Sequence, residues 1–371
     1  SSATDPLSRV RAAVTPAPGV TELRTFPAPA VGPDDGVLAV EACGLCGTDW
    51  EFYIRRRGAH LGPLILGHEI VGRVVAVGAR AAARWRVAAG DRVAVEEFLP
   101  CGHCQFCFTG RPALCDATDS RSERPFLRYG ATSVDVPPAL WGGFSELLYL
   151  HPRALVHRVP PDLPADLATL FVPVSNGIRW VLKEGQMPRG GVAVVIGPGA
   201  HGLGCVVAAR DGGAACVVAV GRTRGARLQA AEALGAVAVE AATTDPVEAV
   251  REITGGAMAD VVVDLAPDAA ETTAAAVRMA RTGGTVILAA AKHGRAGDFP
   301  HDLVVRHALT VKGVRGRDFA SAEEALRIIA SRRYPLERLR THAFALAEAD
   351  QALRVLGERV DPSAIHIALT P

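Results

Sequence analysis

Four cysteines lie close together near the end of the first third of the chain. Their pattern is C-x2-C-x2-C-x7-C, made by Cys101, Cys104, Cys107 and Cys115. Four thiolates with this spacing can close a tetrahedral shell around zinc, as in structural zinc sites. An iron–sulfur cluster uses similar spacing, so spacing alone leaves the metal open. We expect a metal-binding lobe at residues 101–115.

A second group has residue types that can hold a catalytic metal. Cys46 ends the segment Cys43-Gly-Leu-Cys46, and Gly67 precedes His68 and Glu69. Cysteine, histidine and glutamate all bind zinc, and three protein ligands leave one position for water or substrate. A redox C-x-x-C pair and a buried histidine are the alternatives. The redox pair normally lies in a thioredoxin-like strand–helix unit, and that setting is missing here.

A glycine motif follows a short apolar run. Residues 192–196 read Val-Ala-Val-Val-Ile and lead into Gly197-Pro-Gly199-Ala-His201-Gly202, which is G-x-G-x-x-G. Such glycines permit a tight turn, close approach of a pyrophosphate and close packing of helix on strand. The helix N-terminus then offers N–H groups and partial positive charge to the phosphates. A glycine-rich turn without a ligand is the alternative. We expect a dinucleotide site.

The end of the next predicted strand bears on cofactor choice. NAD-selective sites usually place Asp or Glu there, to accept from the ribose 2′-hydroxyl. Here Val220-Gly221 is followed by Arg222, Thr223 and Arg224. Two guanidinium groups and a hydroxyl suit a 2′-phosphate, although two solvated arginines in a loop are an alternative. We favour NADP, with NAD possible.

Composition excludes other classes of partner. The 40 Lys and Arg balance 39 Asp and Glu to a net charge of +1, and aromatics make up 5%. This gives neither a general field for nucleic acid or anionic lipid nor many stacking platforms for single strands. The N-terminus shows no basic stretch followed by an apolar run, so we expect no signal peptide and a cytoplasmic protein. The glycine-rich stretch 190–209 is charge-free, but it suits a turn between two elements better than a membrane helix.

The residue pattern changes along the chain. The first part has short β-branched runs between turn signals, which predicts a β-rich domain. From about residue 166, apolar strands alternate with alanine-rich helices, which predicts a parallel sheet covered on both faces. The expected strands are 192–196, 216–220, 260–264 and 285–288, and the expected helices are 227–234, 246–253 and 270–281. After about residue 310 the sequence again has a β-rich pattern, with a helix near 322–330. We therefore expect the C-terminal stretch to rejoin the first domain.

Together these motifs resemble the zinc-dependent medium-chain dehydrogenase/reductase family, close to its sorbitol and threonine dehydrogenase branches. The resemblance covers essentially the whole chain and implies an α/β protein: a Rossmann doubly wound sheet plus a GroES-like β-rich catalytic domain, usually in a homodimer or homotetramer. It places the catalytic domain at 1–172 and 310–371 and the Rossmann domain at 173–309. The motifs include residues 44–49, 67–72, 90–93, 142–144, 197–204, 283–286 and 311–313.

The resemblance also implies roles for individual residues. Cys46, His68 and Glu69 match ligands of a catalytic zinc, and the four cysteines of the lobe match those of a structural zinc. Thr48 matches the hydroxyl that takes the alcohol proton, with Glu51 at the outer end of the relay, and Asn176 is expected near the nicotinamide.

Three positions depart from the family pattern. Val172 stands where the family has Cys, Asp or Glu, and valine cannot bind metal. Either Glu69 ligates the zinc directly, with Glu96 and Glu97 as candidate substitutes, or the catalytic zinc is weakly bound or absent. Glu51 replaces a histidine, and His201 replaces a branched apolar residue behind the nicotinamide. We expect an enzyme that interconverts a small alcohol and a carbonyl. The alternatives are an NADPH-dependent reductase of a conjugated C=C or C=N bond in which zinc takes no chemical part, and a non-catalytic cofactor-binding relative.

Overall fold

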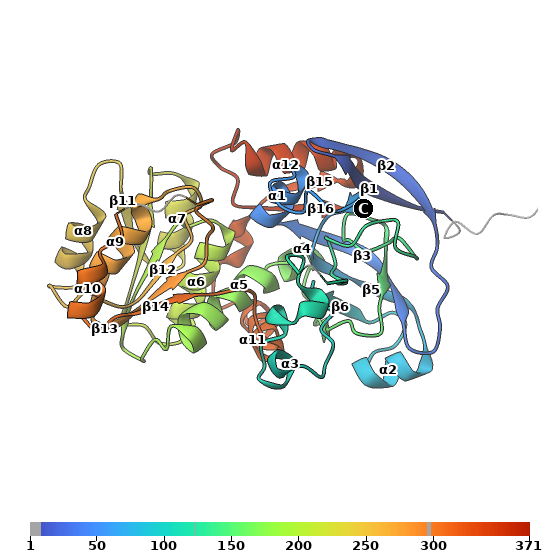
Figure 1. Ribbon diagram of the computed structural model, residues 1–371, viewed down its shortest axis with the longest axis horizontal. Coiled ribbons are helices and arrows are strands. Elements are labelled where there is room, and N and C mark those ends of the chain that lie inside the picture. The colour runs from blue at the N-terminus through green and yellow to red at the C-terminus, as the bar shows by residue number, and fades with distance from the viewer. Residues whose placement is uncertain (1–8, 123, 295–297) are drawn as a thin grey trace, which may run out of the picture. The chain divides into compact units, whose positions relative to one another are not determined.

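The chain divides into two compact units. A computed structural model describes residues 9–122, 124–294 and 298–371; the extreme N-terminus, where we expect no signal peptide, lies outside these ranges. Unit 1 comprises residues 1–171 and 340–371, and unit 2 comprises residues 172–339 (Figure 1). Among the helices of the described ranges, none has both the length and the apolar character needed to cross a membrane.

Unit 2 is built on a six-stranded parallel sheet. Its order is β11-β10-β9-β12-β13-β14, so the chain starts in the middle, moves to one edge and then returns to fill the other half. This reversal is the mark of a doubly wound sheet. The strands are β9 (Val192–Ile196), β10 (Cys216–Gly221), β11 (Val237–Glu240), β12 (Ala259–Asp264), β13 (Ala280–Leu288) and β14 (Thr310–Gly313).

Helices cover both faces of this sheet, as right-handed crossovers require. α6 (Ala200–Asp211) and α7 (Ala226–Ala233) follow the strands of the first half and contact each other. α8 (Pro246–Ile253) and α9 (Glu271–Met279) contact each other on the second face, beside α10 (His301–Arg306) (Figure 1). Buried valines of β9, β10 and β12 form a core with buried residues of α8 and α9. Further helices of this region are α5 (Phe171–Gly177), the π-helix η4 (Ile178–Glu184), α11 (Phe319–Ala330) and the 3-10 helix η5 (Leu336–Leu339).

Unit 1 is β-rich, as predicted. Its larger sheet has the order β15-β16-β3-β5-β6-β8, with β7 on β3, and a smaller sheet has the order β2-β1-β4. The strands are β1 (Arg9–Ala17), β2 (Val20–Pro27), β3 (Gly36–Leu45), β4 (Leu64–Ile65), β5 (Glu69–Val77), β6 (Arg92–Val95), β7 (Leu147–Leu150), β8 (Val156–Arg158), β15 (Arg340–Ala345) and β16 (His366–Thr370). The helices are α1 (Gly47–Tyr53), α2 (Ala79–Trp85), α3 (Gln105–Phe108), α4 (Ala165–Ala168) and α12 (Ala349–Gly357).

The C-terminal boundary differs from the expected one. We expected residues 310–371 to rejoin the first domain, but residues 310–339 belong to unit 2. The reason is that β14 pairs in parallel with β13, and Val311 packs against the core of that sheet. The chain re-enters unit 1 at Arg340, where β15 begins.

Candidate functional site

Helix α1 presents the first candidate metal ligand at its N-terminus. Cys46 is the N-cap, and its Sγ accepts a hydrogen bond from the Thr48 backbone N–H at 3.3 Å. Asp49 completes a capping box by accepting from the Cys46 N–H at 3.0 Å. The sequence Cys-x-x-Asp therefore fixes both the start of the helix and the direction of the thiol.

Two further candidate ligands come from the start of β5. His68 Nε2 lies 3.1 Å from Cys46 Sγ, and the possible ligand atoms of Cys46, His68 and Glu69 all lie within 4.8 Å of one another. All three residues are buried. The structure thus brings together the three residues that the sequence predicted for a catalytic metal.

Asp49 and His366 support this group, and neither was predicted from the sequence to belong to it. Asp49 Oδ1 accepts from the Gly67 N–H and lies 3.2 Å from His68 Nδ1. Burial opposes the charged imidazole, but Asp49 and Cys46 outweigh it and raise the pKa of His68 well above its usual value. His366 Nε2 lies 2.9 Å from Glu69 Oε2. The capping-box spacing could have drawn attention to Asp49, whereas nothing local in the sequence marks His366.

The donor set fits zinc. One sulfur, one imidazole nitrogen and one carboxylate are zinc ligands, and each lies about 2.0–2.3 Å from the ion in known sites. The separations in this group are already close to what a shared ion imposes. A buried carboxylate beside a buried thiol also needs a positive charge for compensation.

The other expected residues of unit 1 have partners outside this group. Thr48 is half-buried in the first turn of α1, and Glu51 forms an ion pair with Arg56 at 3.1 Å. Glu96 contacts His157 at 2.9 Å and Glu97 contacts Arg128 at 3.5 Å. Among the described residues, the metal-capable group contains neither Glu96 nor Glu97.

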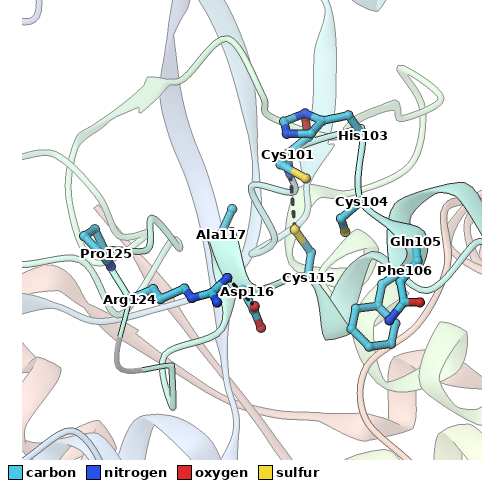
Figure 2. Close-up of a pocket in the computed structure, with 10 residues that line it drawn as sticks. All are labelled: Cys101, His103, Cys104, Gln105, Phe106, Cys115, Asp116, Ala117, Arg124 and Pro125. Atoms are coloured by element: carbon cyan, nitrogen blue, oxygen red, sulfur yellow. Dashed lines mark hydrogen bonds and ion pairs between the residues drawn. The ribbon is translucent and has the colours of Figure 1, made fainter.

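The cysteine lobe forms the second metal-capable group. Its four sulfurs lie within 4.8 Å of one another, and none of the four cysteines is in a disulfide. Figure 2 shows the thiols of Cys101 and Cys115 close together, with the Cys101 N–H donating to Cys115 Sγ at 3.3 Å. A hollow of about 380 Å³ opens beside them.

The pKa values of Cys101 and Cys107 are shifted in opposite directions. A backbone N–H at His103 is the largest influence that lowers the pKa of Cys101, to about 6, whereas burial raises the pKa of Cys107 to about 12. Four crowded thiols therefore do not all ionise unaided, and a bound Zn²⁺ would supply the charge that makes them thiolates.

The glycine motif of unit 2 has the geometry of a dinucleotide site. Gly197 has φ +90°, which favours glycine in the turn after β9. A Cβ on Gly199, the N-cap of α6, would meet nothing within 4 Å, so the backbone is open to a pyrophosphate. A Cβ on Gly202 would lie 2.2 Å from the Gly197 carbonyl oxygen, so only glycine at this position lets α6 pack this closely against the end of β9.

The other expected cofactor residues fall into two places in unit 2. Asn176 Nδ2 lies 3.3 Å from His201 Nδ1, at the start of α6. Arg222, Thr223 and Arg224 are exposed directly after β10. The Arg224 side chain forms an ion pair with Glu232 at 2.8 Å.

Comparisons with known proteins agree with this construction. Residues 32–161 match the alcohol dehydrogenase GroES-like domain, and residues 200–331 match the zinc-binding dehydrogenase domain. A probable alcohol dehydrogenase of Mycobacterium tuberculosis is 41% identical over 98% of both chains. An L-threonine 3-dehydrogenase of Bacillus subtilis is 29% identical, over 90% of this chain and 91% of that protein.

A solved structure shows the same architecture. A putative zinc-binding dehydrogenase from Sinorhizobium meliloti, bound to NADP, superposes with a TM-score of 0.84 at 26% identity, covering 98% of this chain and all of that one. The GroES-like domain and the Rossmann domain expected from the motifs are thereby confirmed. The chain belongs to the zinc-dependent medium-chain dehydrogenase superfamily of oxidoreductases.

Proposed function

We propose that the protein interconverts a small alcohol and its carbonyl by hydride transfer, with catalytic and structural zinc ions and with NADP preferred over NAD. The observation that carries the proposal is the buried Cys46–His68–Glu69 group in a chain that also has a dinucleotide motif. In the oxidative direction the alcohol carbon loses a hydride and its oxygen loses a proton. The products are the carbonyl, the reduced cofactor and one proton.

Cys46, His68 and Glu69 would hold the catalytic zinc, which, when bound, supplies a Lewis acid that lowers the pKa of an alcohol hydroxyl. The structural zinc would be held by the four cysteines of the lobe. Thr48, two residues after Cys46, would accept the alcohol proton. Glu51 follows Thr48 at i+3 on α1, so both lie on one face of the helix, and Glu51 would pass the proton to solvent.

The residues of unit 2 would bind the cofactor. The backbone at Gly197, Gly199 and Gly202 would receive the pyrophosphate at the N-terminus of α6. Asn176 and His201 would face the nicotinamide half. Arg222, Thr223 and Arg224 would receive the 2′-phosphate of NADP, in a chain whose second strand ends without a carboxylate.

Exchange of Thr48 tests the proton relay. In Thr48→Ala we expect kcat for alcohol oxidation to fall about 10²–10⁴-fold, because a positioned proton acceptor contributes that much. Thr48→Ser keeps the hydroxyl and should keep most of the rate. Steady-state rates over a panel of primary and secondary alcohols provide the measurement. An unchanged kcat in Thr48→Ala would remove Thr48 from the mechanism.

Val172 supports one rival function. A valine side chain has no metal-binding atom, which suits a reductase of a conjugated C=C or C=N bond that uses NADPH without catalytic zinc. Elemental analysis of the purified protein separates the two functions. Two zinc ions per chain and loss of turnover in Cys46→Ser support the alcohol dehydrogenase, whereas one zinc ion and full turnover in Cys46→Ser support the reductase.

A further inference from the structure

A buried histidine from the C-terminal strand contacts the carboxylate of the candidate metal group. His366 is the first residue of β16, and its Nε2 lies 2.9 Å from Glu69 Oε2. The two side chains are 0% and 1% exposed. Since an ionised carboxylate can only accept, the ring N–H donates to Glu69.

The fold leaves room for this contact at one glycine. Gly44 of β3 pairs with Glu69 on one side and with Ala368 on the other. A Cβ on Gly44 would lie 2.2 Å from Glu69 Oε2 and 2.7 Å from His366 Nε2. Three neighbouring strands therefore build the contact, and a side chain at Gly44 would separate its partners.

Each candidate ligand has its own orienting partner. The Thr48 N–H donates to Cys46 Sγ, and Asp49 contacts His68 Nδ1. His366 occupies the corresponding place for Glu69. Its other ring nitrogen, Nδ1, is buried and has no hydrogen-bond partner among the described residues. Glu69 is therefore the polar contact that explains a histidine at this position.

We infer that His366 is a positioning residue that holds Glu69 in the orientation in which it binds the metal ion. This inference rests on the proposed zinc site. The contact engages Oε2 of Glu69. Among the described residues, the group whose possible ligand atoms all lie within 4.8 Å of one another consists of Cys46, His68 and Glu69, and His366 lies outside it. Partners of this kind typically contribute about 10–100-fold to metal affinity.

Two amide variants of the full chain test the inference. His366→Gln places an amide N–H near the position of Nε2, whereas His366→Asn is too short to reach Glu69. Zinc affinity is measured by competition with a chromophoric chelator, and the ligand geometry is followed in the visible spectrum after cobalt substitution. We expect His366→Asn to lower the affinity for one of the two zinc ions about 10–100-fold and to alter the cobalt spectrum. His366→Gln should restore both, and the zinc of the cysteine lobe should be retained throughout.

The buried pair of His157 and Glu96 provides a matched control. Its contact is also 2.9 Å, and its side chains are also 0% and 1% exposed. His157→Asn should lower thermal stability without changing zinc affinity. The inference is overturned if His366→Asn keeps wild-type affinity for both zinc ions. It is also overturned if His157→Asn lowers zinc affinity by the same factor as His366→Asn.

A double-mutant cycle checks that His366 acts through Glu69. In a Glu69→Ala background, His366→Asn should have no further effect on zinc affinity, and an additive loss would overturn the inference. Wild-type protein that binds one zinc ion would overturn the proposed function and this inference together. Two zinc ions with no effect of His366→Asn would overturn the inference alone.

Discussion

Arg222 is the side chain on which we expect the choice of cofactor to depend. Arg224 is already engaged with Glu232, while Arg222 is exposed directly after β10. A charge-assisted hydrogen bond contributes about 1.5–3 kcal/mol. Arg222→Asp should therefore lower kcat/KM for NADP about ten- to a hundred-fold and raise it for NAD, because the new carboxylate can accept from a ribose hydroxyl. Steady-state kinetics with both cofactors provide the measurement, and a wild type that already favours NAD contradicts the prediction.

At the same scale, the site could be predicted only where its residues are close in sequence. Cys46, His68 and Glu69 fall in two short motifs of residue types that bind zinc, so spacing pointed to them. The supporting contact between His366 and Glu69 could not be predicted. Glu69 and His366 are 297 positions apart, and only the strand order β16-β3-β5 brings them together.

Two glycines of the motif between β9 and α6, Gly199 and Gly202, differ in the space around their Cβ positions. A Cβ on Gly202 would lie 2.2 Å from the Gly197 carbonyl oxygen and 3.0 Å from its carbonyl carbon, and these backbone atoms cannot move aside as a flexible side chain can. Gly199 has φ −74° and open space at its Cβ position. We therefore expect Gly202→Ala to lower the melting temperature, since overpacking costs about 1–3 kcal/mol. Gly199→Ala should melt like the wild type but bind NADP at least tenfold more weakly, because its methyl occupies the approach of the pyrophosphate.

Thermal melting and calorimetric titration with NADP test this pair. Equal losses of stability in the two variants would show that both glycines serve packing alone. Normal NADP affinity in a stable Gly199→Ala would remove the pyrophosphate from this position.

Element boundaries were predictable where strands are apolar throughout. The run predicted at 192–196 is β9, and 246–253 is α8, because buried parallel strands and strongly amphipathic helices leave clear patterns. β14 was not assigned to the parallel sheet. It has four residues, three of them polar or glycine, so its own sequence carries no sign that it pairs with β13.

The two units differ in how the chain builds them. Unit 2 is continuous, and its sheet and core lie between residues 192 and 313. Unit 1 is closed by the C-terminal segment, because β16 lies between β15 and β3 and buries Ile367 and Leu369. Removing residues 340–371 would leave an unpaired edge on β3 and take apolar side chains out of the core. Unit 1 therefore depends on both ends of the chain, and unit 2 does not.

This difference predicts the behaviour of fragments. The fragment 172–339 should fold by itself, with a cooperative melting transition, and should bind NADP, because the glycine motif and Arg222 both lie within it. Ligand at about a hundred times its Kd should stabilise the fragment by about 2.7 kcal/mol. The fragment 1–171 should show no cooperative transition until residues 340–371 are restored through a linker. Circular dichroism melts with and without NADP measure both outcomes. A fragment 172–339 that remains unfolded would show that unit 2 needs unit 1 to fold, and a cooperative 1–171 would show that β16 is dispensable for the β-rich core.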